Sequence, residues 1–176
     1  MHDAINEINP NSTVLVTLSL DPESQNFFQR LRDQYFPPDR NIVPAHVTLF
    51  HKLPESSGEK IKADIQTVVQ RPAFDLHVTS IMNTGSGVSY KLESPEFCDL
   101  HKQLRNQWLQ WLTPQDRQGF RPHIVVQNKV SVETAKRTYE VLQGQFQTFT
   151  ARSADIILWR YLGGPWEELE SFRFTT

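Results

Sequence analysis

Residues 43–50 of the chain read VPAHVTLF, and a similar stretch, FRPHIVVQ, returns at residues 120–127, with His46 and His123 standing 77 residues apart at matching places. Both stretches are rich in β-branched and other apolar residues, which favours β-strands. Pro44 stands two residues before His46, and Pro122 stands directly before His123. Proline is tolerated at the entrance of a strand because no central hydrogen bond is lost there. The two stretches therefore predict two equivalent strands, each opening on a histidine.

Side chains of a strand alternate between its two faces, so residues two apart share a face. This alternation places six residues on one matching face of the two strands: His46, Thr48, Phe50, His123, Val125 and Gln127. The aliphatic residues between them are expected to point into a core. The shared face is therefore where we expect a site.

The order of elements along the chain predicts an internal duplication. Residues 13–82 are expected to form a strand, a helix, the first histidine strand, a helix and a strand, and residues 88–152 repeat that order. The last strand of the repeat is expected near 147–152, and two further strands near 154–162 and 166–175. Helices packed against largely antiparallel strands define the α+β class.

A duplicated unit suggests two lobes around a cleft. We expect a flexible tail over residues 1–12 and a single domain over 13–176, with lobes at about 13–86 and 87–162 and a closing strand at 166–175. In this bilobal duplication, antiparallel sheets line the central cleft and helices pack outside.

Composition narrows the class of partner. The chain has 176 residues and a formal net charge of −2, without the cationic excess of proteins that grip long nucleic acid. Small or terminal substrates fit better, and no obligate protein partner is inferred. Cys98 is the single cysteine, the first residues lack a signal-peptide pattern, and no apolar run approaches the ~20 residues of a membrane span. These features predict a cytoplasmic protein with no membrane contact.

His77 opens a third candidate pattern, His-Val-Thr-Ser, at residues 77–80. It has no preceding proline, and the residue 77 positions later is Ala154, so the duplication supplies no partner for it. We interpret His77 as an ordinary strand residue.

The other three histidines also have structural interpretations. His51 lies five residues after His46, an odd separation that predicts the opposite face of the strand, at the surface. His101 falls within an amphipathic helix, and His2 within the tail. Neither histidine stretch contains an acidic residue, and the chain has no His-Glu-x-x-His motif and no cysteine cluster, so we predict no metal site and no cofactor.

Two tetrads of the form His-hydrophobic-Thr/Ser-hydrophobic, about half a domain apart, resemble those of the two-histidine (2H) phosphoesterases. The Arg-Pro-His of residues 121–123 most resembles the 2′-5′ RNA ligase-like branch, which includes RNA 2′,3′-cyclic phosphodiesterases. The first tetrad, residues 46–49, matches the family pattern, whereas the second has Val125 where the family has a hydroxyl residue. The resemblance implies the bilobal fold and a metal-independent phosphodiesterase.

Paired imidazoles suit this chemistry because histidine titrates near pH 6.5, so one ring can be neutral and the other protonated near neutral pH. The neutral ring accepts a proton from the nucleophile and the cationic ring protonates the leaving oxygen. We predict His46, Thr48 and His123 as catalytic residues, with the Thr48 hydroxyl donating to a phosphate oxygen.

Four further residues are predicted to contact substrate: Phe50, Arg121, Val125 and Gln127. Arg121 would add a cationic contact to phosphate, and Phe50 a surface on which a base stacks, although a core position is an equally good interpretation of Phe50.

By resemblance, the substrate carries a 2′,3′-cyclic phosphate or a 2′-5′ linkage, at an RNA end or in a small nucleotide. The residues leave open which histidine is the acid and which the base. They also leave open two rival functions: a nucleotide or RNA-end binding protein that keeps the fold but has weak catalysis, as Val125 permits, and a structural domain without a site.

Overall fold

The computed structural model describes residues 11–176, so the expected tail and His2 lie outside the described residues except for residues 11 and 12. The elements follow in this order: β1 (Thr13–Leu20), α1 (Pro22–Tyr35), β2 (Val47–Pro54), α2 (Gly58–Val68), β3 (Asp75–Asn83), β4 (Val88–Glu93), α3 (Pro95–Trp108), α4 (Pro114–Arg117), β5 (His123–Gln127), α5 (Val132–Gln145), β6 (Phe149–Tyr161) and β7 (Trp166–Arg173). Short 3₁₀ turns cover Glu55–Ser57 and Leu109–Trp111. Over this described range, no helix combines the length and the apolar character needed to cross a bilayer.

The seven strands form one sheet in the order β2-β1-β6-β3-β4-β5, with β7 paired to β6, and every pairing between these strands is antiparallel. Exchanging each strand for its counterpart in the other half, β1 with β4, β2 with β5 and β3 with β6, reverses this order and leaves it otherwise unchanged. The sheet therefore has a pseudo-twofold symmetry, and the structure has the α+β class that the pattern predicts. The two histidine strands, β2 and β5, are the ends of the strand order, and they approach each other in space.

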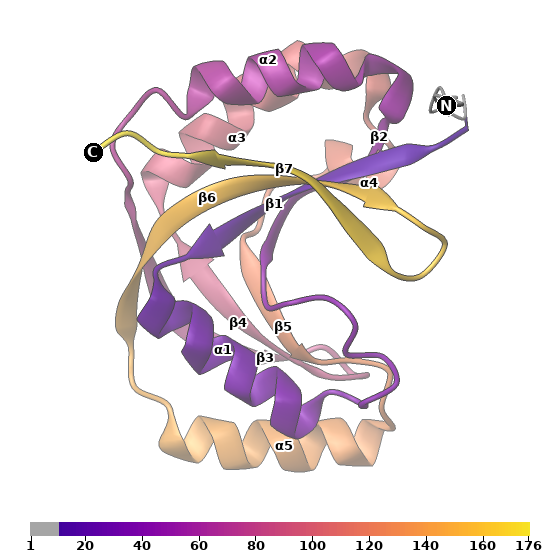
Figure 1. Cartoon of the computed structure of the whole chain (residues 1–176). Helices are drawn as coiled ribbons and strands as arrows, with labels where there is room; N and C mark the ends of the chain where they lie inside the picture. The colour runs from indigo at the N-terminus through magenta and orange to yellow at the C-terminus, as the bar shows by residue number, and fades with distance from the viewer. Residues whose placement is uncertain (1–10) are drawn as a thin grey trace, which may run out of the picture.

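The two halves of the chain exchange strands. β3 belongs to the first half but pairs with β4 and β6, and β6 belongs to the second half but pairs with β1 as well as β3. A boundary at residue 86 therefore does not separate the two groups of strands, which corrects the lobes expected at 13–86 and 87–162. Figure 1 shows β6 as a long curved strand through the molecule, with α2 and α3 at one end and α1 and α5 at the other.

β6 is one strand where two were expected, near 147–152 and 154–162. Its residues 149–152 pair with β3, and residues from Ser153 onward pair with β1, with an irregularity in register near Ser153. The buried Ser153 hydroxyl accepts a hydrogen bond from the backbone N–H of Phe74 at 2.9 Å. The strand bends here without ending because its hydrogen-bonding partners change while the extended backbone continues.

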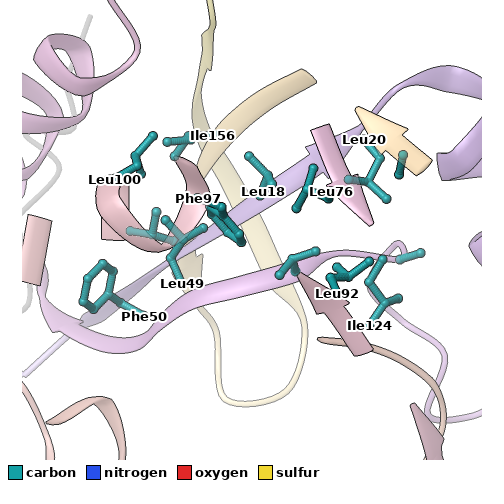
Figure 2. Packing of buried hydrophobic residues seen from close by; sticks show 14 of the residues in the cluster. Leu18, Leu20, Leu49, Phe50, Leu76, Leu92, Phe97, Leu100, Ile124 and Ile156 are labelled. Atoms are coloured by element: carbon teal, nitrogen blue, oxygen red, sulfur yellow. The ribbon is translucent and has the colours of Figure 1, made fainter. Parts of the chain in front are cut away.

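Helices of each half pack on the histidine strand of the other half. α1 lies against β5, and α3 reaches β2 through His101, whose ring stacks on Phe50 with centroids 4.6 Å apart. Figure 2 shows Leu49 and Phe50 beside Phe97 and Leu100 of α3 in the buried core. The exchange joins both halves into one core, so the two histidine strands are positioned by the whole domain.

The β3–β4 hairpin ends against β5. Gly85 has φ of +89°, a conformation that favours glycine, and a Cβ at Gly87 would overlap the backbone carbonyl of Gln127. Glycine at position 87 therefore lets the hairpin approach the end of β5.

Candidate active site

His46 and His123 line one hollow of about 580 Å³, together with Thr48 and Val125. His46 directly precedes β2, and His123 is the first residue of β5. The two strand entrances that the repeated sequence predicts are thus brought to the same hollow. Four of the seven predicted site residues meet there.

The two imidazoles are held in the same way. Nδ1 of His46 lies 2.7 Å from the carbonyl oxygen of Pro44, and Nδ1 of His123 lies 2.9 Å from that of Arg121. A carbonyl oxygen only accepts hydrogen bonds, so Nδ1 is the protonated nitrogen of each ring. Nε2 is left in both rings for chemistry, and in a neutral ring it is a base.

The surroundings of His46 disfavour the charged form of its ring. Burial lowers the pKa of His46 to about 4; the positive charges of Arg32, His51 and His123 act in the same direction, and only the hydrogen bond to Pro44 opposes them. His46 is therefore neutral near pH 7, which suits a proton acceptor.

Arg32 of α1 brings a buried positive charge to the hollow. It is only 2% exposed, and its Nε and Nη1 donate to Asn41 Oδ1 at 3.1 Å and to the Val125 carbonyl at 3.0 Å. The guanidinium carbon also lies 4.2 Å from the centroid of the Phe36 ring. Burial lowers the pKa of Arg32 to about 10, which leaves it charged at neutral pH, and the neighbouring Asp33 has the opposite effect.

Within residues 11–176, Arg32 forms no ion pair with a carboxylate. A buried charge without a counter-ion is costly, and a bound anion would stabilise it. Sequence reasoning missed Arg32 because nothing in its helix marks it; the proximity to β5 arises only in the tertiary structure.

The same irregularity interrupts both histidine strands. In β2, Thr48 and Phe50 face the adjacent residues Thr17 and Val16 of β1, so β2 carries one extra residue at this point. In β5, Val125 and Gln127 face the adjacent residues Ser89 and Val88 of β4. The two β-bulges fall 77 residues apart, at equivalent places of the duplication.

A β-bulge turns two successive side chains to the same face and reverses the alternation beyond it. Phe50 is 0% exposed in the core, and Gln127 is 2% exposed, with Nε2 donating to Thr138 Oγ1 of α5 at 2.9 Å. The predictions that Phe50 and Gln127 lie on the site face are therefore wrong. The bulges are the cause, and a simple period of two cannot reveal them.

Beyond the bulges, the residues that follow face the hollow. His51 and Asn128 both line it, and they occupy equivalent positions in the two halves. The prediction that His51 points to the opposite face from His46 is wrong for the same reason. Sequence reasoning missed His51 because it counted an unbroken alternation from His46.

His51 is fixed by a buried carboxylate of α4. Its Nδ1 lies 2.8 Å from Asp116 Oδ1, and its backbone N–H donates to both carboxylate oxygens at 3.1 and 2.9 Å. The backbone N–H of Lys52 also donates to Asp116 Oδ2 at 3.2 Å. Asp116, which is 6% exposed, thus holds both the strand and the ring of His51.

Arg121 faces a smaller hollow of about 210 Å³ that adjoins the larger one, with Thr48, His51 and His123 lining both. Its carbonyl holds the His123 ring, as described above, and its side chain is exposed. The structure therefore places Arg121 at the smaller hollow beside the candidate site, whereas Arg32 lines only the larger one.

Trp166 of β7 lies across the larger hollow, and sequence reasoning missed it. Its ring centroid is 5.0 Å from that of His46 and 5.9 Å from that of Trp159. Trp159 Nε1 donates to Thr17 Oγ1 of β1 at 2.8 Å, which anchors this pair of rings. The Gly163-Gly164 turn before β7 was a usable signal, since it returns the chain along β6 toward the histidines.

Cations dominate the charged side chains around the larger hollow. Arg32, Arg40 and Lys129 line it, with Asp39 as the carboxylate, 3.8 Å from Arg40. Lys129 has φ of +62°, and its N–H donates to Asn128 Oδ1 at 2.9 Å. This balance favours an anion, although the whole chain has a net charge of −2.

The two remaining described histidines have structural partners. His77 is exposed on β3 with Nδ1 3.0 Å from Thr150 Oγ1. His101 is buried between Phe50 and Phe120, with Nε2 3.2 Å from the Leu49 carbonyl oxygen, and burial lowers its pKa to about 4. In the described part of the chain, no three His, Cys, Asp or Glu side chains gather as metal ligands would.

A model of the 2′-5′ RNA ligase superfamily matches residues 20–165. The chain therefore belongs to this superfamily of two-histidine phosphoesterases. No curated protein matches the chain.

Solved structures share the fold at low sequence identity. LigT from E. coli, in complex with 3′-AMP, has a TM-score of 0.64 at 16% identity, over 94% of this chain and 99% of LigT. TT0787 from Thermus thermophilus has a TM-score of 0.64 at 17% identity, over 92% and 97% of the two chains. Usb1 from Kluyveromyces marxianus has a TM-score of 0.51 at 13% identity, over 95% and 100%.

Proposed function

We propose that this chain is a metal-independent phosphodiesterase that cleaves 2′,3′-cyclic phosphate or 2′-5′ phosphodiester bonds of RNA ends or small nucleotides. The observation that carries the proposal is the pair of imidazoles in one hollow, each with Nδ1 held by the carbonyl two residues before it. Such a pair has Nε2 available on both rings, as proton transfer to and from one phosphate requires.

The two histidines take different roles in this proposal. His46 is the base because its lowered pKa keeps Nε2 unprotonated at neutral pH. Nε2 accepts a proton from the attacking water as the water oxygen bonds to phosphorus. The bond from phosphorus to the ribose oxygen breaks, and the protonated His123 transfers its Nε2 proton to that oxygen.

Two further residues stabilise the phosphate. The hydroxyl of Thr48, which lines the hollow beside both histidines, donates to a non-bridging oxygen. The guanidinium of Arg32, buried without a carboxylate partner, supplies positive charge as negative charge develops on the phosphate. Arg32 thus gains a counter-ion when substrate binds.

The nucleoside part lies against Trp166 in this proposal. Trp166 is partly exposed at the hollow, whereas Phe50 is wholly buried, so Trp166 is the aromatic surface on which a base can stack. The solved complex of E. coli LigT with 3′-AMP supports the idea that this fold accommodates a nucleotide.

The second candidate function is nucleotide or RNA-end binding without efficient turnover. Val125 favours it, because this residue lines the hollow at the position where a second hydroxyl would hold the phosphate. Lost hydrogen bonds to the phosphate weaken catalysis more than they weaken binding if those bonds strengthen in the transition state.

Incubation of the purified protein with 2′,3′-cyclic nucleotides and with 2′-5′-linked dinucleotides, with a chelator present, separates the two functions. Turnover that survives the chelator supports the phosphodiesterase. Saturable binding without turnover, measured by calorimetry with the same compounds, supports the binding protein. The absence of both turnover and binding would contradict both functions.

A further inference from the structure

His51 shares the centre of the site with two residues that the proposed mechanism uses. Thr48, His51 and His123 are the three residues that line both the larger and the smaller hollow. In the proposed function Thr48 and His123 contact the scissile phosphate, so the phosphate lies where the two hollows meet. His51 therefore borders the phosphate position.

Only one of the two ring nitrogens of His51, Nδ1, is hydrogen-bonded within the fold. Asp116 accepts hydrogen bonds from Nδ1 and from the backbone N–H of His51, and the carboxylate itself is buried. This contact fixes the orientation of the ring and leaves Nε2 as its second polar atom. The side chain is 43% exposed, so Nε2 has access to a ligand.

The equivalent position in the other half of the duplication carries an amide in place of an imidazole. Asn128, the counterpart of His51, uses Oδ1 to accept from Ser86 Oγ at 3.0 Å and from the Lys129 N–H. Val125 has no hydroxyl, and Gln127, the nearest amide on β5, is buried against Thr138. β5 thus lacks the hydroxyl that Thr48 provides on β2.

We propose that His51, as an imidazolium whose Nδ1–H donates to the Asp116 carboxylate, donates a second hydrogen bond from Nε2–H to the scissile phosphate and fills the role that a hydroxyl at position 125 would have. The inference rests on the proposed function, because it assumes a phosphate between His46 and His123. It makes His51 a phosphate-binding residue and Asp116 a positioning residue.

Replacing His51 tests the inference by its effect on kcat/KM for a 2′,3′-cyclic nucleotide. His51→Phe is expected to lower kcat/KM by about tenfold to hundredfold, the effect of losing a charge-assisted hydrogen bond. His51→Gln keeps an N–H donor and is expected to lose less. His77→Phe is the matched control, because His77 is exposed on β3 and does not line either hollow.

A double-mutant cycle with Val125→Thr separates the proposed role from a structural one. The new hydroxyl is expected to raise kcat/KM more in the His51→Phe background than in the wild-type background, because only the former lacks a donor. Equal effects of Val125→Thr in both backgrounds, or wild-type kcat/KM in His51→Phe, would overturn the proposal.

Asp116→Asn is compared in the same two backgrounds. Acting through His51, it should lower kcat/KM in the wild-type background and cause no further loss when His51 is already phenylalanine. Any loss of folding stability, in contrast, is expected in both backgrounds because Asp116 also accepts from backbone N–H groups. A further loss of kcat/KM in the His51→Phe background would contradict the positioning role.

Inorganic phosphate provides a readout that does not need turnover. Calorimetry is expected to show weaker phosphate binding in His51→Phe than in the wild type and in His77→Phe. If the wild type binds phosphate but turns over no substrate, the proposed phosphodiesterase fails and this comparison still decides the role of His51. Equal phosphate affinity in wild type and His51→Phe, or no phosphate binding by the wild type, would overturn the inference.

Discussion

β2 and β5 occupy equivalent places in the duplicated fold but present different side chains to the same hollow. Each strand has a histidine at its entrance whose Nδ1 is held by the carbonyl two residues before it, and each carries a β-bulge at the same position. Beyond these shared features, β2 contributes Thr48 and His51, whereas β5 contributes Val125 and accepts a hydrogen bond from Arg32 through its Val125 carbonyl.

The shared features position the two rings, and the differences give the rings different neighbours. The Nδ1 contact and the bulge recur on both sides because they depend on extended backbone and strand register. The electrostatic environment differs, because the buried Arg32 stands where the other half has Leu109, and the buried Asp116 stands where it has the exposed Asp39. A duplicated fold can therefore place two like residues symmetrically and still give them different surroundings, which is the basis for proposing His46 as the base.

The largest expected effect comes from removing either ring. His46→Ala and His123→Ala should each lower kcat/KM on a 2′,3′-cyclic nucleotide by about a thousandfold or more, because each removes one proton-transfer role worth roughly 10²–10⁴. His77→Ala, which changes an exposed histidine outside the hollow, should retain most activity. Steady-state kinetics on the three proteins make this comparison, with circular dichroism to confirm folding.

The second-largest effect on kcat/KM is expected from Arg32, which donates to the Val125 carbonyl of β5. Arg32→Leu removes a positive charge that the hollow places near phosphate, so kcat/KM is expected to fall by about tenfold to hundredfold. Arg32→Lys keeps the charge and should lose less than Arg32→Leu, even though a lysine cannot reproduce the fork that contacts Asn41 and Val125. Equal losses in the two variants would mean that Arg32 acts by packing alone.

The two tetrads differ in having Thr48 on β2 and Val125 on β5. Exchanging threonine and valine is therefore expected to change kcat/KM by different amounts at the two positions. Thr48→Val should lower kcat/KM several-fold to about tenfold, the range of one neutral hydrogen bond, whereas Val125→Thr should raise it by less. The first change removes the tetrad hydroxyl, and the second adds one to a site that already works without it. An unchanged kcat/KM in Thr48→Val would remove Thr48 from the mechanism.

The smallest expected effect is on folding stability. It comes from His101, which lies between the two stretches that contain His46 and His123. His101 lies between Phe50, which follows the first tetrad, and Phe120, which precedes the second, and its pKa falls from 6.5 to about 4 in the folded chain. A lowered histidine pKa means that the unfolded state binds the proton first, so the free energy of unfolding falls as pH drops from about 6.5 toward 4. The contribution of His101 is about 2 kcal/mol between pH 8 and pH 5.

Urea unfolding of wild type and His101→Phe over this pH range measures that contribution. The variant should be less stable at pH 8, because the hydrogen bond to the Leu49 carbonyl is lost, but its stability should depend less on pH. The same pH dependence in both proteins would show that the proton is taken up elsewhere, for instance at His46, whose pKa is lowered in the same direction.

The repeated sequence predicted much of this arrangement by itself. The spacing of His46 and His123, the prolines before them and the repeated element order were enough to predict two equivalent strands, an α+β duplication and a shared site. These features are local, because they follow from the preferences of neighbouring residues and from comparing one half of the chain with the other.

The tertiary structure decided which other residues join the histidines. The bulges withdraw Phe50 and Gln127 into the core and bring His51 to the hollow, and they depend on pairing with β1 and β4, which lie far away in the sequence. Arg32, Asp116 and Trp166 reach the site from α1, α4 and β7 only because the halves exchange strands and pack as one core. Strand register and long-range packing are properties of the folded chain, so no alternation counted along a single strand reveals them.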